Sequence, residues 1–378
     1  MPGLFTSRPV ADDSGSEACF KMAKFWLKTC LETHDDLCQV KRSLPLPTRV
    51  LDVGIPESPS ATLHISNGEY GEWVTLSHCW GKFHPATTTA ENLSSQCNGI
   101  LVSTLPKTFQ DAITITRKLG YRYLWIDSLC IIQDSILDWE RESVKMNTVY
   151  ANAVLNISAD AAADSSEGIF ESSNRKIDGK APFFTPPRQD YTRIPVHSPK
   201  SGLKSTLYAS LWHGNEFADN DHIGGRGWVL QEAVLSHRRL RYTSSGIAWS
   251  CARVPSFCDE TRPHEIHDLT EQDSYITSVY QIPRQPLPPR YIYEPKDAGR
   301  RYQVIQWWYR RINDYVNRQL TFSLDKFPAF SGIAEAYCDR TQYHYKAGIM
   351  IEDFRRGLLW QPCGRPIDLE VGPSWSWA

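Results

Sequence analysis

The sequence predicts an α/β protein whose core is a mainly parallel sheet with helices on both faces. Three strand-like segments, 73–80, 123–133 and 153–158, alternate with two helix-like segments, 104–119 and 136–151. This order is typical of a parallel sheet covered by helices. Hydrophobic residues form 41% of the 378-residue chain and charged residues 22%. That composition provides for a packed core and excludes a wholly disordered chain.

Local signals support these five segments. The strand-like segments are apolar runs, and Gly81 ends the first of them. The predicted helix at 104–119 has Pro106 near its start and Gly120 directly after its end. Proline is common in the first turn of a helix, and glycine is common just after the last turn. For the helix at 136–151 we predict an inward face made of Trp139, Val144, Met146, Val149 and Tyr150.

Further elements surround this core. Apolar residues recur at helical spacing from Cys19 to about Cys38, and a short strand is predicted at 49–53. The later predicted elements are a hairpin at 238–242 and 247–251 and two aromatic helices at 301–320 and 330–337.

Composition shifts divide the chain into three predicted parts. Residues 1–45 form an N-terminal lead and helix, and 46–260 form the α/β domain. Ser, Pro, Asp and Gly are frequent at about 165–225, which indicates a long irregular insertion. Residues 261–378 form a mainly helical C-terminal region that packs on the core.

Charge and cysteine usage exclude several classes of protein. Lys plus Arg number 41 and Asp plus Glu 43, a balance that argues against a nucleic-acid partner. The basic, aromatic stretch Arg284–Arg318 fits a core-facing helix with a solvated side better than a nucleic-acid surface. No apolar run approaches the roughly 18 residues of a membrane span. Ten cysteines without framework spacing, and no secretory signal, predict free thiols in a cytoplasmic protein.

Three blocks of sequence carry a family resemblance. They are 75–81 (TLSHCWG), 124–134 (LWIDSLCIIQD) with its helix to Tyr150, and 226–232 (RGWVLQE). In this order they closely resemble the signature blocks of the fungal heterokaryon-incompatibility (HET) domain family. Further similarity extends from the blocks toward both ends of the chain.

The resemblance implies a fold and a role. Family members trigger growth arrest and cell death when genetically different fungal cells fuse, a form of innate immunity. The domain is distantly similar to TIR domains, so the resemblance implies a Rossmann-like, TIR-like sheet. Some TIR domains cleave NAD with a catalytic glutamate, which makes NAD a candidate substrate. Other members occur in secondary-metabolite gene clusters. We expect a protein partner or small-molecule ligand, and a homo-oligomer is a further expectation.

Asp127 interrupts an apolar strand near its carboxyl end, where ligands of open parallel sheets bind. Cys130, Gln133 and Asp134 fall at the same edge or in the loop after it. A buried carboxylate must be paired, hydrogen-bonded or protonated. Asp127 is therefore either a site residue or a structural partner for an arginine or a loop, and the structural role is favoured.

Glu142 lies on the following helix in a charged stretch. The spacing alone favours a solvated helix face with local ion pairs. The resemblance raises Glu142, because it lies in the second block and is a candidate for the TIR-like carboxylate.

Ser77, His78 and Cys79 end the first strand. Adjacent strand residues point to opposite faces, so His78 and Cys79 do not form a regular dyad, whereas Ser77 and Cys79 share a face. Cys79 could meet Cys130 from the neighbouring strand; an inert, buried Cys79 is the favoured alternative.

The third block places polar residues around a predicted helix start. If a helix begins at 229–232, Arg226 and Glu232 flank its first turn, where polar ligands can bind. A structural turn with an Arg–Glu pair is the equal alternative. In full, the predicted catalytic residues are Asp127, Glu142, Cys79, Cys130 and His78, and the predicted ligand-binding residues are Ser77, Trp80, Gln133, Asp134, Arg226, Trp228, Gln231 and Glu232.

Cys30, His34 and Cys38 share one face of the predicted N-terminal helix, because positions four apart drift by only about 40°. Sulfur and imidazole suit zinc, but a structural zinc site has four ligands. The sequence has no CxxC partner, and Cys251 and Cys258 are too loosely spaced to assign. We therefore assign no metal from the sequence.

Three functions follow. The first is a regulator of fungal incompatibility and cell death with TIR-like cleavage of NAD. The second is a stand-alone enzyme of a secondary-metabolite pathway that uses Cys79, Cys130, His78 or Asp127 as acid, base or nucleophile. The third is a non-catalytic interaction module.

Overall fold

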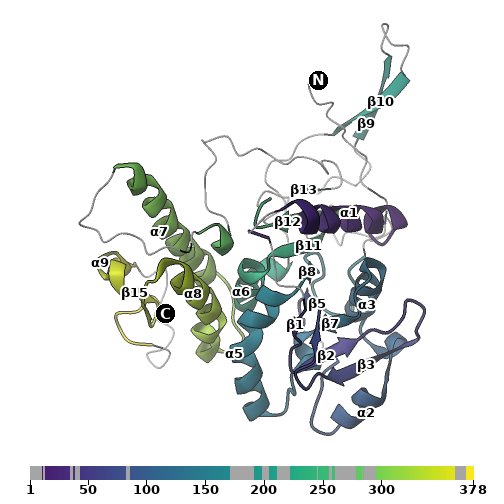
Figure 1. Ribbon diagram of the computed structural model, residues 1–378, viewed down its shortest axis with the longest axis horizontal. Helices are drawn as coiled ribbons and strands as arrows, with labels where there is room; N and C mark the ends of the chain where they lie inside the picture. Colours follow the sequence, from purple (N-terminus) through teal and green to yellow (C-terminus); the bar gives the residue numbers. More distant parts are fainter. Residues whose placement is uncertain are drawn as a thin grey trace.

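Figure 1 shows the computed structural model of the chain. The structure describes residues 11, 13–34, 37–38, 43–81, 86–170, 191–197, 204–210, 222–244, 246–254, 258–259, 278–282, 284, 295–361 and 372–378. Most of the predicted insertion at 165–225, and most of the segment before the first aromatic helix, lies outside these residues. The three-part division of the chain remains a prediction.

A mixed sheet forms the centre, with strands in the order β13-β12-β11-β8-β5-β7-β2-β3-β6. In chain order these strands are β2 Arg49–Asp52, β3 Ser60–Ile65, β5 Trp73–Ser77, β6 Ile100–Leu101, β7 Tyr123–Trp125, β8 Leu155–Ser158, β11 Arg238–Thr243, β12 Gly246–Cys251 and β13 Cys258–Asp259. Two-stranded pairs lie outside it: β1 Leu44–Pro45 with β4 Tyr70–Gly71, β9 Tyr191–His197 with β10 Lys204–Ser210, and β14 Tyr345–Lys346 with β15 Ile349–Met350.

The α-helices are α1 Glu17–Thr33, α2 Leu93–Asn98, α3 Lys107–Leu119, α4 Asp127–Cys130, α5 Ile136–Asn152, α6 Gly227–Leu235, α7 Pro295–Val316, α8 Pro328–Thr341 and α9 Phe354–Gly357. Single turns of 3₁₀-helix are η1 Val102–Thr104, η2 His222–Gly225, η4 Val279–Gln281, η5 Ser323–Lys326 and η6 Ile351–Asp353.

The middle of the sheet is parallel, as the sequence predicts. β5 pairs in parallel with β7 on one side and with β8 on the other, and β8 pairs in parallel with β11. The outer strands are antiparallel: β2 pairs with β7 and β3, and β12 pairs with β11 and β13. The sheet is therefore mixed, and its central strands have the parallel arrangement that alternating strands and helices produce.

Side-chain alternation along β5 fixes which helix covers which face. Val74 and Leu76 join the core cluster that includes Phe109 of α3 and residues of α1. Trp73 joins the cluster that includes Tyr150 of α5. Because successive strand residues point to opposite faces, α1 and α3 cover one face and α5 covers the other. In Figure 1, α6 lies beside α5, α8 packs against both, and α7 and α9 extend the helical C-terminal part.

The helix ends follow their local signals. Gly120 adopts a left-handed conformation with φ 90° after α3, and its N–H bonds to the carbonyls of Arg117 and Thr116. Ser135 caps α5 by accepting the N–H of Asp138. α1 ends at Thr33, so the predicted helix to about Cys38 is five residues too long.

Two expectations about the second block are wrong. The predicted strand 123–133 ends at Trp125, and Asp127 begins the short helix α4. The predicted inward face of α5 fails at Val144, which is 75% exposed, while Glu142 is buried. A short apolar run suits a buried strand and a buried helix equally, so periodicity alone does not show where β7 ends and α4 begins.

Gly332 of α8 tests how the C-terminal helices dock on the core. A Cβ atom at Gly332 would lie 2.5 Å from Cβ of Asn147 and 2.7 Å from Oε1 of Gln231. We expect Gly332→Ala to lower the free energy of unfolding by about 1–3 kcal/mol, because overpacking outweighs the better helix propensity of alanine. Urea unfolding measures it. The exposed neighbour Ser331→Ala is the control, and we expect a change within about 0.5 kcal/mol. A Gly332→Ala protein as stable as wild type would contradict this packing.

Candidate functional site

Ser77 and Glu232 form the centre of the candidate site. Ser77 is the last residue of β5, and Glu232 lies on α6, 155 positions later in the chain. The Ser77 hydroxyl donates a hydrogen bond to Oε2 of Glu232, and Nδ2 of Asn156 donates to Oγ of Ser77 at 2.9 Å. The first and third blocks therefore meet at the carboxyl end of β5.

The Glu232 carboxyl group is almost completely buried, with 4% exposure. Burial raises its pKa from 4.5 to about 7, although the charge of Arg226 and the hydrogen bond from Ser77 act in the opposite direction. A carboxyl group with this pKa is present in both protonation states near neutral pH. That is the property expected of a general acid or base.

Arg226 connects the third block to the first in a second way. It is the N-cap residue of α6, and its guanidinium donates to the carbonyl oxygen of His78. The backbone on either side of Arg226 is held by Gln319, which accepts the N–H of Gly227 at 2.8 Å. The helix start predicted at 229–232 therefore lies at Gly227, and Arg226 and Glu232 flank the first turns as expected.

His78 points to the opposite face from Ser77. Its ring packs edge-on against Phe109, with 5.0 Å between centroids, and its Nδ1 lies 3.9 Å from Oδ1 of Asp127. Burial lowers the pKa of His78 to about 4, although Asp127 raises it. The imidazole is therefore neutral at pH 7, and its Nε2 atom has no hydrogen-bond partner among the described residues.

Asp127 brings the second block to the same place. It follows β7 and begins α4, where its Oδ1 accepts the N–H of Ser128 at 2.7 Å. Its Oδ2 accepts the indole N–H of Trp80 at 2.9 Å. With 19% of its side chain exposed, Asp127 is more accessible than His78 or Glu232. We call Ser77, His78, Asp127, Arg226 and Glu232 the rim cluster.

Glu142 lies apart from the contacts of the rim cluster. Its carboxylate accepts hydrogen bonds from Oγ1 of Thr48 at 2.9 Å and Nζ of Lys145 at 3.0 Å. At 3% exposure the Glu142 carboxylate itself is buried, so the expectation that it is solvated is wrong, whereas the expected local ion pair forms with Lys145. These partners give Glu142 a role in holding α5 against the segment before β2.

Other predicted ligand-binding residues have structural partners. Gln133 donates to the carbonyls of Asp127 and Ile131, each at 3.1 Å, and Asp134 accepts the N–H of Ala90 at 2.9 Å. These contacts hold the loop after α4.

Trp228 and Gln231 face the C-terminal helices. The indole of Trp228 donates to Asp325 at 3.0 Å, and Oε1 of Gln231 accepts the N–H of Gly332 at 2.9 Å. Of the four predicted ligand-binding residues in the third block, Trp228 and Gln231 therefore pack α6 against its neighbours, and Arg226 and Glu232 belong to the rim cluster.

Cys79 and Cys130 belong to different apolar clusters. Cys79 packs with Ile223 and Val229, whereas Cys130 packs among residues of β7 and α5. Burial raises the pKa of Cys79 to about 11 and that of Cys130 to about 12. Both thiols are therefore protonated at neutral pH, which makes them poor nucleophiles in this conformation.

Sequence reasoning missed two members of the site's surroundings. Tyr150 was expected only as a core residue, but its hydroxyl donates to the carbonyl of Leu76 at 3.1 Å and lies against Glu232. Asn156 sits inside a buried strand and bonds both Oγ1 of Thr75 and Oγ of Ser77. A buried asparagine within an apolar strand was the available signal, because buried polar groups need partners.

Two surface cavities lie away from these residues. One, of about 580 Å³, is lined by residues that include Asp52, Arg117 and Arg122. The other, of about 240 Å³, lies in the C-terminal region beside Trp308 and Trp377. Neither is lined by a member of the rim cluster.

The comparison with protein families agrees with this arrangement. Residues 73–232 match the family described as Heterokaryon incompatibility protein (HET). The match begins at the first residue of β5, ends at Glu232 and contains all three blocks. Residues 73–232 of the chain are therefore similar to the HET domain. No curated protein and no solved structure matches the chain. Among the described residues, no helix has the length and apolarity needed to cross a membrane.

The buried carboxyl group makes stability depend on pH. Between pH 4.5 and about 7 the unfolded chain loses the Glu232 proton while the folded chain keeps it, so wild type loses stability as pH rises. Glu232→Gln removes this titration but keeps a neutral side chain. We expect the stability of the variant relative to wild type to rise by about 3 kcal/mol across this range.

Urea unfolding of both proteins at a series of pH values measures this difference. Groups that titrate in both proteins, such as His78, cancel in the comparison. A difference that stays constant with pH would contradict a raised pKa at Glu232.

Proposed function

We propose that this chain acts in fungal self/non-self recognition and that its HET domain cleaves NAD, with Glu232 as the essential carboxylate. The observation that carries the proposal is the buried Glu232 carboxyl group, whose pKa is about 7, at the carboxyl end of the central parallel strand. Glu142, the carboxylate favoured from the sequence, is engaged by Thr48 and Lys145 instead.

The topology supports a ligand site at this position. β5 has β7 on one side and β8 on the other, so the chain leaves β5 in one direction and returns past it to reach β8. Such a reversal opens a crevice beyond the carboxyl ends of the two strands, where ligands of open α/β sheets bind. Ser77 ends β5 and Ser158 ends β8, so the rim cluster lies at the edge of the sheet where this rule places a ligand.

The cleavage of NAD suits a carboxyl group with the pKa of Glu232. Cleavage breaks the bond between nicotinamide and ribose; nicotinamide leaves with the bonding electrons, and positive charge develops on the ribose. Ionised Glu232 can stabilise that charge and take a proton from the water that attacks the sugar. The balanced reaction converts NAD and water into ADP-ribose, nicotinamide and a proton. Arg226 is a guanidinium suited to a diphosphate.

The closed geometry supports regulated activity. Ser77, His78 and Glu232 are each at most 4% exposed, and Arg226 is held on the carbonyl of His78. A nucleotide reaches Glu232 only after the Arg226 segment moves. A protein that responds to cell fusion needs an inactive resting state, and displacement of this segment by a partner or by self-assembly would supply the trigger.

Glu232→Gln tests the proposal against a matched control, Glu142→Gln. Both residues are buried glutamates on helices of the HET domain, and the substitution is the same. With full-length protein, at concentrations up to those at which it assembles, we expect nicotinamide release from NAD by wild type. Release should fall about 100-fold or more in Glu232→Gln, whereas Glu142→Gln should keep most of it per folded molecule. Chromatographic measurement of nicotinamide and ADP-ribose gives the rates.

Three outcomes would contradict the proposed role of Glu232. Loss of release in Glu142→Gln alone would return the role to that residue. Equal release by all three proteins would reject both glutamates. Absence of release from wild type in every assembly state would reject NAD cleavage and leave the pathway enzyme and the non-catalytic interaction module.

A further inference from the structure

Four metal-binding side chains meet outside the matched HET range. The Sγ atoms of Cys30, Cys38 and Cys251 and a ring nitrogen of His34 all lie within 4.8 Å of one another. Cys30 is in the last turn of α1, His34 is its C-cap, and Cys251 is the last residue of β12. We propose that these four side chains bind one structural zinc ion.

The geometry is close to that of a tetrahedral zinc site. Bonds of about 2.3 Å to sulfur and about 2.0–2.1 Å to nitrogen place neighbouring ligand atoms about 3.5–3.8 Å apart. Sγ of Cys251 lies 3.4 Å from Nδ1 of His34, and the other ligand pairs need to close by about 1 Å or less. Three sulfurs and one imidazole are a ligand set that structural zinc sites use.

Burial sets this cluster apart from scattered surface cysteines. Cys30 is 1% exposed, Cys38 is fully buried, Cys251 is 6% exposed and His34 is 9% exposed. All three cysteines are free thiols. Nε2 of His34 has no hydrogen-bond partner among the described residues, which is costly for a buried polar atom. Hydrogen bonds among the four side chains therefore leave Nε2 of His34 without a partner.

Each sulfur also accepts an N–H group. Nε of Arg238 donates to Cys30 at 3.2 Å, the backbone N–H of Val254 donates to Cys251 at 3.3 Å, and the backbone N–H of Arg253 donates to Cys38. Such donors stabilise thiolates rather than thiols, and groups that hydrogen-bond metal ligands orient them in metal sites. These N–H groups are therefore placed to orient coordinating sulfur atoms.

Arg238 supplies the charge that such a site needs. Three thiolates and one neutral imidazole around Zn²⁺ carry a net charge of −1. The Arg238 side chain, 2% exposed, bonds Cys30 and the carbonyls of Val154 and Cys38. Among the described residues these are its partners, so the buried guanidinium has no carboxylate to balance it. A zinc–thiolate centre would be its counter-ion.

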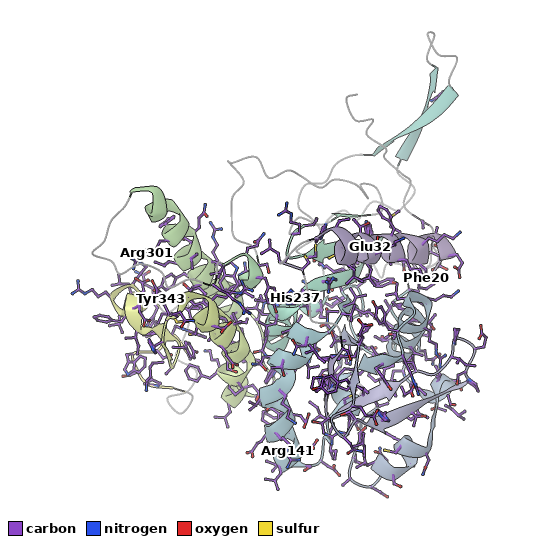
Figure 2. The ribbon with its side chains drawn as sticks, viewed as in Figure 1. Phe20, Glu32, Arg141, His237, Arg301 and Tyr343 are labelled. Carbon is purple, nitrogen blue, oxygen red and sulfur yellow. The ribbon has the colours of Figure 1, made fainter. Side chains whose placement is uncertain are left out.

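The ion would join two segments of the chain, one before and one after the residues of the HET match. His34 and Cys251 are 217 positions apart in the chain. Figure 2 labels Glu32 on α1 and His237 just before β11, and Nδ1 of His237 lies 3.3 Å from the carbonyl of Leu37, which follows α1 in the chain. Zinc here would fasten α1 and the segment after it to the antiparallel edge of the sheet.

Metal analysis of the full chain tests the proposal. The protein is produced in zinc-replete cells, separated from any affinity tag and purified under a non-thiol reductant without chelator. We expect about one zinc ion per chain. Replacement by Co²⁺ should give the intense visible absorption and the sulfur-to-cobalt charge-transfer band of tetrahedral thiolate coordination.

Matched variants locate the ion. Cys251→Ser should lose zinc and the cobalt spectrum. Cys19→Ser should keep both, because Cys19 is a 2% exposed thiol on the same helix whose Sγ contacts the carbonyl of Asp13 instead. If Cys251→Ser does not fold, the wild-type metal content and cobalt spectrum decide.

Wild type that binds neither zinc nor cobalt under reducing conditions would overturn the proposal. So would a disulfide among the three cysteines in the purified protein, or zinc retained by folded Cys251→Ser. None of these results bears on Glu232, so the proposed NAD cleavage and the zinc site fail or stand separately.

Discussion

The buried hydrogen bond between Ser77 and Glu232 is the interaction on which the candidate site depends. It joins the end of the central strand to a helix encoded 155 positions later, and it does so where almost no water reaches the carboxyl group. Burial of a carboxyl group is costly unless it is protonated or paired. The charge of Arg226 and the hydrogen bond from Ser77 offset part of that cost. The remaining cost of burial raises the pKa of Glu232 to about 7. A group held in this way is poised to change protonation state when its surroundings open.

The remaining site geometry follows from the alternation of side chains along β5. Ser77 faces α6 while His78 faces α3, so one strand end presents polar groups to both faces of the sheet. Arg226 then ties the two faces together by donating to the carbonyl of His78. These contacts join the first and third blocks, and the hydrogen bond from Trp80 to Asp127 joins the first block to the second. The three blocks therefore form one connected polar cluster.

Most of the fold was predictable from the sequence, and the site was only partly so. Periodicity and Gly or Pro signals located β5, α3, α5 and the β11–β12 hairpin, because those signals are local. Whether Glu142 or Glu232 is the site carboxylate depends on which residues from distant segments pack beside each one, and no local spacing carries that information. The same limit applies to Cys251, which joins Cys30 and His34 only through the sheet. The strand predicted at 123–133 is too long because Asp127 begins a helix rather than interrupting a strand.

The direct test of the account is the titration of the Glu232 side chain itself. Carbon-13 NMR of protein labelled at the glutamate side-chain carboxyl follows each carboxyl signal with pH, and the signal absent from Glu232→Gln identifies residue 232. We predict a midpoint near pH 7 for this signal in the folded protein. A midpoint near 4.5, the ordinary value for glutamate, would mean that the carboxyl group is solvated, and it would contradict the buried cluster at the end of β5.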